Sequence, residues 1–179
     1  MSAPIHRFEI NLADTDRSHY EQIELRLARH PSETERYLVT RALAFCVLHE
    51  PELQMTAGIC HGDEPAIELR DSTGLRTHWI DVGRPSAAHV QRGLRDSPRV
   101  SLATTRDPTE VVRVLESADV RLLDRLEVIG LEERFVAALA ERLDRRNLWS
   151  VTITGGRLYV EADASVVEGA LDRLALAES

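Results

Sequence analysis

The fold is decided by the stretch DEPAIELRDSTGLRTHWIDVGRPSAAHVQR, residues 63–92. Two short extended segments, Pro65 to Arg70 and Arg76 to Val82, flank a loop rich in turn residues, which predicts an antiparallel pair of strands. The Gly-Arg-Pro-Ser that follows predicts a helix that begins at about Ser86 and ends before Pro98. The stretch is therefore expected to form two strands and then a helix.

The segment before this stretch carries the clearest helix start of the chain. Ser32 can act as an N-cap, Glu35 lies three residues further on as its capping-box partner, and a long apolar run follows. We expect a helix from about Glu33 to about His49, with a carboxylate partner for Arg41 because this arginine falls among apolar residues. With a strand expected at Arg99 to Thr104, the order becomes helix, strand, strand, helix, strand.

The rest of the chain adds strands and helices at both ends. Two hairpins are expected, one from Ile5 to Leu12 with Ile23 to Leu27, and one from Leu148 to Thr154 with Arg157 to Glu161. A further strand is expected at Leu126 to Ile129, with helices at about Pro108 to Ser117 and Glu132 to Arg145. The tail, Val166 to Leu174, allows either assignment. The fold class predicted is α/β (α+β), with a mixed central sheet flanked by helices.

Length and composition are those of an ordinary folded protein. The chain has 179 residues, 43% hydrophobic and 29% charged, which predicts a single domain over 1–179, since a domain takes roughly 100 to 200 residues. The apolar run at 42–48 is far shorter than the roughly 20 residues of a membrane span. The N-terminus lacks the apolar core of a signal peptide, and Cys46 and Cys60 form no disulfide framework. We therefore expect a cytoplasmic protein with two inert, buried thiols.

The net charge of −8 restricts the partners. An acidic surface repels phosphate backbones, which argues against a protein that coats nucleic acid through a broad basic face. It leaves open an enzyme that acts on nucleic acid, because a carboxylate site that binds a divalent cation reverses the local sign.

Several acidic residues of the central stretch can converge on one place. Alternate side chains of an extended chain share a face, so Trp79, Asp81 and Gly83 should point the same way. Asp63 and Glu64 stand at the start of the neighbouring strand, and Glu68 lies within it as a solvated residue. Converging carboxylates are what a divalent-metal phosphodiesterase needs, because oxygen ligands hold Mg²⁺ or Mn²⁺ and the metal activates water.

The chain also resembles a known group of bacterial proteins, the YaeQ family, in register over nearly its whole length. The motifs that carry the resemblance are NLADTDR at 11–17, LARHPSET at 27–34, DEP at 63–65, WIDVGRP at 79–85 and the Gly155-Gly156 hairpin. The combination is more specific than any one of these motifs.

The resemblance implies a PD-(D/E)XK restriction-endonuclease-like core at about 30–105, with added N- and C-terminal strands. In that fold an acid of the first helix, one at the second core strand and one on the third bind the metal. Carried over to this chain, the ligands would be Glu33, either Asp63 or Glu64, and Asp81, with Mg²⁺ or Mn²⁺ as the cofactor. Asp81 is the strongest single candidate and would also be catalytic.

The lysine that the resemblance calls for, two residues after the third acid, is replaced by Gly83. Glycine leaves space there, and Arg92 from the following helix is our candidate to supply the charge. Arginine can stabilise a transition state but cannot act as a base near neutral pH. Arg92 fits equally well as a structural ion-pair partner for one of the acids, and Arg84 is a candidate for substrate binding.

Two functions follow as hypotheses. The first is a metal-dependent phosphodiesterase that acts on DNA or RNA. The second, motivated by the missing lysine and the acidic surface, is a non-catalytic binding module that retains the fold and associates with nucleic acid or with the transcription machinery. An acidic pocket for a small phosphorylated ligand is a third possibility.

Overall fold

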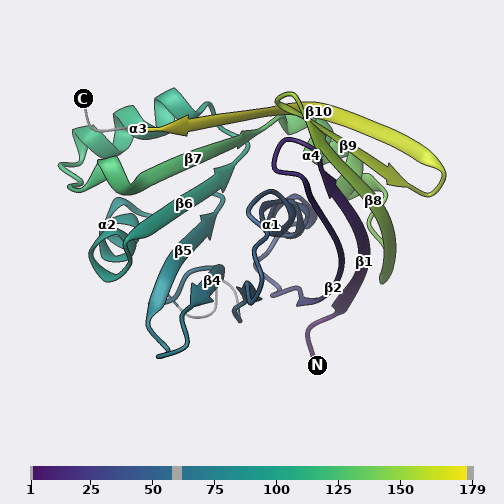
Figure 1. Ribbon diagram of the computed structural model, residues 1–179, viewed down its shortest axis with the longest axis horizontal. Coiled ribbons are helices and arrows are strands. Elements are labelled where there is room, and N and C mark those ends of the chain that lie inside the picture. Colours follow the sequence, from purple (N-terminus) through teal and green to yellow (C-terminus); the bar gives the residue numbers. More distant parts are fainter. Residues whose placement is uncertain (1, 58–61, 177–179) are drawn as a thin grey trace. The chain divides into compact units, whose positions relative to one another are not determined.

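The computed structural model describes residues 2–57 and 62–176. Helices and strands follow one another along this part of the chain in a mixed α+β fold (Figure 1), which confirms the predicted class at that level. The chain divides into two compact units: Met1–Leu48 with Leu131–Leu171, and His49–Gly130 with Asp172–Ser179. The single domain over 1–179 stays a prediction.

The first unit contains a sheet with the strand order β2-β1-β8-β9-β10. Its strands are β1 (Ile5–Asp14), β2 (His19–Ala28), β8 (Arg146–Thr154), β9 (Arg157–Ala162) and β10 (Ser165–Ala175), the last of which ends in the second unit. β1 and β8 are parallel and the other pairs within the unit are antiparallel. Both predicted hairpins are confirmed, and the ambiguous tail forms β10.

Local sequence explains these strands. In β1 the side chains of His6, Phe8 and Ile10 are buried while their neighbours are exposed, as a strand with one buried face requires. Gly155 and Gly156 connect β8 to β9 with φ angles of 57° and 73°. Both angles are positive, as a primed two-residue turn demands, and glycine adopts them without a steric penalty.

Two helices complete the first unit, α1 (Glu35–Val47) and α4 (Glu133–Glu141). Figure 1 shows α1 inside the curve formed by β1, β2 and β8, and α1 also contacts α4. The predicted end of α4 at Arg145 was wrong. The Asn147 side chain accepts a hydrogen bond from the Asp144 backbone N–H at 2.9 Å and donates one to its carbonyl at 2.8 Å, so this segment is held in a turn.

The predicted start of α1 was also wrong, because the helix begins two residues later than expected. Thr34 is the N-cap and its hydroxyl accepts a hydrogen bond from the Tyr37 backbone N–H at 3.0 Å. The Ser32 hydroxyl is hydrogen-bonded to the ring of His30 instead. Glu33 therefore precedes the helix.

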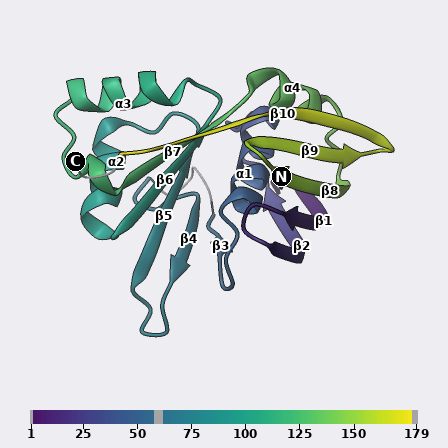
Figure 2. The same cartoon turned by 45° about the horizontal axis from the view of Figure 1, so that its top comes forward.

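The second unit contains the central stretch at residues 63–92. Its strand order is β7-β6-β5-β4-β3, formed by β3 (Gln54–Met55), β4 (Ile67–Arg70), β5 (Arg76–Val82), β6 (Arg99–Thr104) and β7 (Leu126–Leu131). β3, β4 and β5 are antiparallel, whereas β5, β6 and β7 are parallel. The connections between the parallel strands contain α2 (Ala87–Asp96) and α3 (Pro108–Ser117), the latter followed by the 3-10 turn η1 (Leu123–Arg125) (Figure 2).

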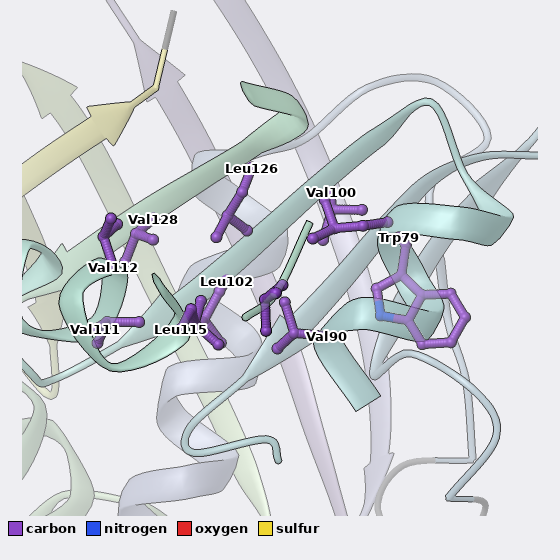
Figure 3. Close-up of a cluster of buried hydrophobic side chains, with 11 residues drawn as sticks. Trp79, Val90, Val100, Leu102, Val111, Val112, Leu115, Leu126 and Val128 are labelled. Atoms are coloured by element: carbon purple, nitrogen blue, oxygen red, sulfur yellow. The ribbon is translucent and has the colours of Figure 1, made fainter. Parts of the chain in front are cut away.

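The two helices of this unit begin where the sequence indicated. The Ser86 hydroxyl caps α2 by accepting a hydrogen bond from the His89 N–H, and the Asp107 carboxylate caps α3. Figure 3 shows the core of the unit, in which Trp79, Val90 and Leu102 meet apolar side chains of α3 and β7. Helix α2 approaches the sheet closely, because a Cβ at Gly93 would lie 2.8 Å from the Trp79 indole nitrogen.

The expectations about membrane spans and about the cysteines can be compared with the structure. No helix of the described residues is long and apolar enough to cross a membrane. Cys46 is a free, buried thiol, and burial raises its pKa to about 12, which makes it unreactive as expected. Cys60 lies outside the described residues.

Candidate functional site

Asp81, the strongest candidate from the sequence, is on β5 one residue before its end. Its side chain is only 5% exposed, and both carboxylate oxygens are engaged. Oδ2 accepts a hydrogen bond from the Trp79 indole N–H at 2.7 Å, and Oδ1 lies 2.8 Å from Nε2 of His89. The bond to Trp79 confirms that these two residues share a face of the strand, as the alternation predicted.

His89 connects this carboxylate to the segment that precedes β4. Its Nδ1 atom lies 2.9 Å from the carbonyl oxygen of Gly62, and its ring meets the Trp79 ring edge-on with centroids 5.3 Å apart. A carbonyl oxygen accepts hydrogen bonds but cannot donate them, and the same is true of an ionised carboxylate. Both ring nitrogens of His89 must therefore carry a proton if the ring is to make both bonds. The arrangement therefore holds His89 as an imidazolium beside the Asp81 carboxylate.

The electrostatics of His89 agree with this geometry. Its hydrogen bond with Asp81 raises the pKa of the ring, burial opposes the rise, and the negative charge of Asp81 and the Gly62 carbonyl add to it. The neighbouring Arg92 lowers the pKa but does not reverse the direction. The site therefore places a ring whose protonated form is favoured in direct contact with the acid that was expected to bind a metal.

Arg92 and Asp63 form an ion pair one helical turn away from His89. The Asp63 side chain is 84% exposed and that of Arg92 is 48% exposed, so solvent screens the pair. The ion-pair alternative for Arg92 is therefore confirmed.

The backbone conformation at Gly83 explains why glycine occupies this position. Its φ angle is +85°, in the left-handed region where a side chain is strained. Its backbone N–H donates to the Ala103 carbonyl at 2.8 Å. The residue at the position of the expected lysine is therefore suited to turning the chain out of β5.

Glu33 has a different partner from the other candidates. Its carboxylate accepts from the Arg41 guanidinium at 3.3 Å, and the two side chains are 0% and 2% exposed. The predicted carboxylate partner of Arg41 is thereby confirmed. Glu33 and Arg41 belong to the first compact unit, whereas Asp63, Asp81 and the remaining candidates belong to the second.

Of the two glutamates near β4, one is exposed and the other is paired with arginines. Glu64 is exposed. Glu68, expected to be solvated, is instead bonded to Arg70 at 3.0 Å and to Arg76 at 2.7 Å. Burial alone would raise the pKa of Glu68, but the hydrogen bonds from the two arginines outweigh it and lower the pKa. The Arg76 guanidinium also lies over the Trp79 ring, 5.0 Å from its centroid.

The described residues do not form a ready metal site. Within residues 2–57 and 62–176, no three His, Cys, Asp or Glu side chains are grouped so that they could hold a metal ion. Mg²⁺ or Mn²⁺ prefers several free carboxylate oxygens, yet Asp81, Asp63 and Glu33 are each bonded to a cationic side chain. The donor set therefore does not fit the ion that the resemblance implied.

The choice of basic residues limits the chemistry further. All 22 Lys and Arg residues of the chain are arginines, so it contains no lysine. Arginine stays protonated and cannot abstract a proton. Sequence reasoning missed His89, although a signal was present: a helix beginning at Ser86 brings His89 and Arg92, three residues apart, to one face.

Comparisons with known proteins match the chain over most of its length. The family model described as YaeQ protein matches residues 1–171. The YaeQ protein of Escherichia coli K12 is 30% identical over 171 residues, which cover 94% of this chain and 93% of the relative. That of Salmonella typhi is 30% identical over 162 residues, with 89% of each chain covered.

Solved structures agree as well. The crystal structure of YaeQ from Xanthomonas axonopodis pv. citri matches with a TM-score of 0.88 at 29% identity, covering 99% of this chain and 100% of that one. The structure of YaeQ from Pseudomonas syringae matches with a TM-score of 0.85 at 31% identity, covering 97% and 96%. On the match of the family model and the agreement with these relatives, the chain belongs to the YaeQ family.

Proposed function

We propose that this protein is a non-catalytic nucleic-acid-binding module that retains a nuclease-like scaffold. Support for the scaffold comes from the order of elements along the chain, in which α1, β4, β5, α2 and β6 follow one another, with only the two-residue β3 between the first two. Among the described residues, which leave out 58–61 between β3 and β4, this is the order of the PD-(D/E)XK core that the resemblance implied.

The basic surface around α2 carries the proposal. From Arg84 to Arg95 the chain has three arginines and no acidic residue, in a protein whose net charge is −8. The arginines Arg84, Arg92 and Arg95 are exposed. A local cluster of this kind attracts a phosphate backbone even when the chain as a whole is acidic.

The proposal that the protein does not cleave nucleic acid rests on the carboxylates that are already hydrogen-bonded. A metal ion at Asp81 would have to displace His89 or Trp79 from a nearly buried carboxylate. Breaking such a buried, hydrogen-bonded pair costs several kcal/mol, on the order of 3–5 when one partner is removed. No lysine in the chain can replace the missing base.

The test measures the binding of labelled single- and double-stranded DNA and RNA by fluorescence anisotropy, in EDTA and over a range of salt concentrations. Replacing Arg84 and Arg95 by glutamine should weaken binding and reduce the slope of log K against log salt by roughly 0.7 to 0.9 for each phosphate that is no longer neutralised. The matched control replaces Arg145 and Arg146, two exposed arginines of the first unit, and should leave the slope unchanged.

The same samples test the alternatives. The proposal is contradicted if no nucleic acid binds, or if both double variants bind alike. Cleavage in Mg²⁺ or Mn²⁺ that Asp81→Asn abolishes would support the metal-dependent phosphodiesterase instead. The hydrogen bonds of His89 support that second candidate, because they link Asp81 to Gly62, the residue that precedes Asp63. A stable protein partner without nucleic-acid binding would favour association with the transcription machinery.

A further inference from the structure

A small cavity lies between α2 and α3, on the side of the sheet that these helices cover. It measures about 50 Å³, and its apolar lining includes Val90 of α2, Leu102 of β6, and Val111 and Leu115 of α3. Figure 3 shows these four side chains gathered around one place in the core of the second unit. The part of the lining that these four residues form is therefore aliphatic.

Two arginines belong to the lining of the same cavity. Arg84 comes from the loop between β5 and α2, and Arg106 from the loop between β6 and α3. Within the described part of the chain, neither guanidinium has a hydrogen bond or an ion pair. The Asp107 carboxylate, the nearest acid in sequence to Arg106, is engaged as the cap of α3 at 2.9 Å from the Thr109 N–H. Two arginines without a hydrogen bond or an ion pair from their guanidinium groups, within the described residues, thus belong to the lining of a largely apolar cavity.

We propose that this cavity binds a small organic oxyanion with a short, branched aliphatic group. The aliphatic group would occupy the space among Val90, Leu102 and Val111, and the oxyanion would bind the guanidinium groups of Arg84 and Arg106. Guanidinium groups bind carboxylates and phosphates through paired hydrogen bonds, which gives both affinity and orientation. This inference does not depend on the proposed binding of nucleic acid.

The volume selects the size of the ligand. A cavity needs at least about 10–15 Å³ for each water-sized group, so 50 Å³ accommodates about three to five non-hydrogen atoms. A propyl or isobutyl group meets this limit. A nucleobase or a phenyl ring exceeds it, so a nucleotide could place only its phosphate here.

The test is a calorimetric or NMR titration of the full-length protein with isovalerate. Each methylene moved out of water strengthens binding about fourfold, so acetate, which lacks three carbons, should bind roughly fiftyfold more weakly. Isovaleramide, which has the same shape without the charge, should bind at least about tenfold more weakly, because it loses the charge-assisted hydrogen bonds. Isobutyl phosphate, compared with isovalerate, identifies which oxyanion the arginines prefer.

Two variants locate the site. Arg106→Gln should weaken isovalerate binding by about tenfold or more, and Ala87→Leu should abolish it, because Ala87 lines the cavity and the larger side chain fills the space. Arg113→Gln, on an exposed arginine of α3, is the matched control and should bind as the unmodified protein does. Thermal melting of each variant verifies that it is folded.

The proposal is overturned if neither isovalerate nor isobutyl phosphate binds, or if the affinities survive in Arg106→Gln and Ala87→Leu. It is overturned equally if inorganic phosphate or acetate binds as tightly as the branched ligands, since the apolar interior would then contribute nothing.

Discussion

The hydrogen bonds of His89 lead to a prediction about stability and pH. Replacing His89 by alanine removes its bond to the nearly buried Asp81 carboxylate and its bond to the Gly62 carbonyl. The bond to the nearly buried Asp81 contributes roughly 1.5–3 kcal/mol, and the bond to Gly62, which is exposed to solvent, roughly 0.5–1.5 kcal/mol. His89→Ala should therefore lower the free energy of unfolding by about 2–4 kcal/mol at pH 5.5.

The loss should depend on pH in a defined direction. The pKa of His89 is raised in the folded protein by its hydrogen bond with Asp81. The stabilisation is then fully present below the ordinary histidine pKa of about 6.5 and disappears as the pH rises through the folded value. The difference in unfolding free energy between the unmodified protein and His89→Ala should shrink by at most about 1.4 kcal/mol per pH unit in that window.

The assay uses urea unfolding followed by tryptophan fluorescence. The chain has two tryptophans, of which Trp149 is in the first unit and Trp79 contacts both Asp81 and His89. In a Trp149→Phe background, emission therefore reports on the second unit alone. This design avoids assuming that the two units unfold together.

The matched control is Gln91→Ala on the same helix. Gln91 makes two hydrogen bonds to the Arg121 backbone, at 2.7 and 3.3 Å, but it has no titratable group. Its loss should cost about 1 kcal/mol and should not vary with pH. A cost for His89→Ala below about 0.5 kcal/mol, or one that is constant between pH 5.5 and 8.5, would refute the assignment of an imidazolium bonded to Asp81.

Three further outcomes are expected from substitutions elsewhere. Glu33→Ala should lower the unfolding free energy by about 3–5 kcal/mol because it removes one partner of a buried ion pair; a denaturation midpoint close to that of the unmodified protein would contradict this. Gly83→Lys, which restores the lysine that the resemblance calls for, should cost about 1–2 kcal/mol at φ +85° and should produce no Mg²⁺-dependent cleavage; calorimetry and a nuclease assay test both points. Gly93→Ala should destabilise by about 1–3 kcal/mol because its Cβ would overlap the Trp79 indole, and an unchanged melting temperature would argue against the close approach of α2.

Features that depend on neighbours in sequence were predictable. The alternation of His6, Phe8 and Ile10 identified β1, and the capping residues Ser86 and Asp107 identified the starts of α2 and α3. A strand periodicity or a helix cap involves atoms only a few residues apart, so the sequence contains the whole interaction.

Features that depend on partners distant in sequence could not be predicted. Thr34 rather than Ser32 caps α1, in a segment where the Glu33 side chain is buried against Arg41. Strand β10 is formed by pairing with β9, and its own sequence pattern did not reveal it. Burial and pairing of this kind arise only when the chain folds, which is why intrinsic propensity is a weak guide to element boundaries.

The same distinction between local and distant interactions applies to the candidate site. By itself the sequence determined that Asp81 stands near the end of a strand on the face of Trp79, that a helix follows, and that no lysine is present. Only the tertiary structure decided that His89, Trp79 and Gly62 meet at or beside the Asp81 carboxylate and that Arg92 pairs with Asp63. The physical reason is that a carboxylate can bind a metal, accept a proton or form an ion pair, and which of these it does depends on the groups that folding brings within about 3 Å of its oxygens.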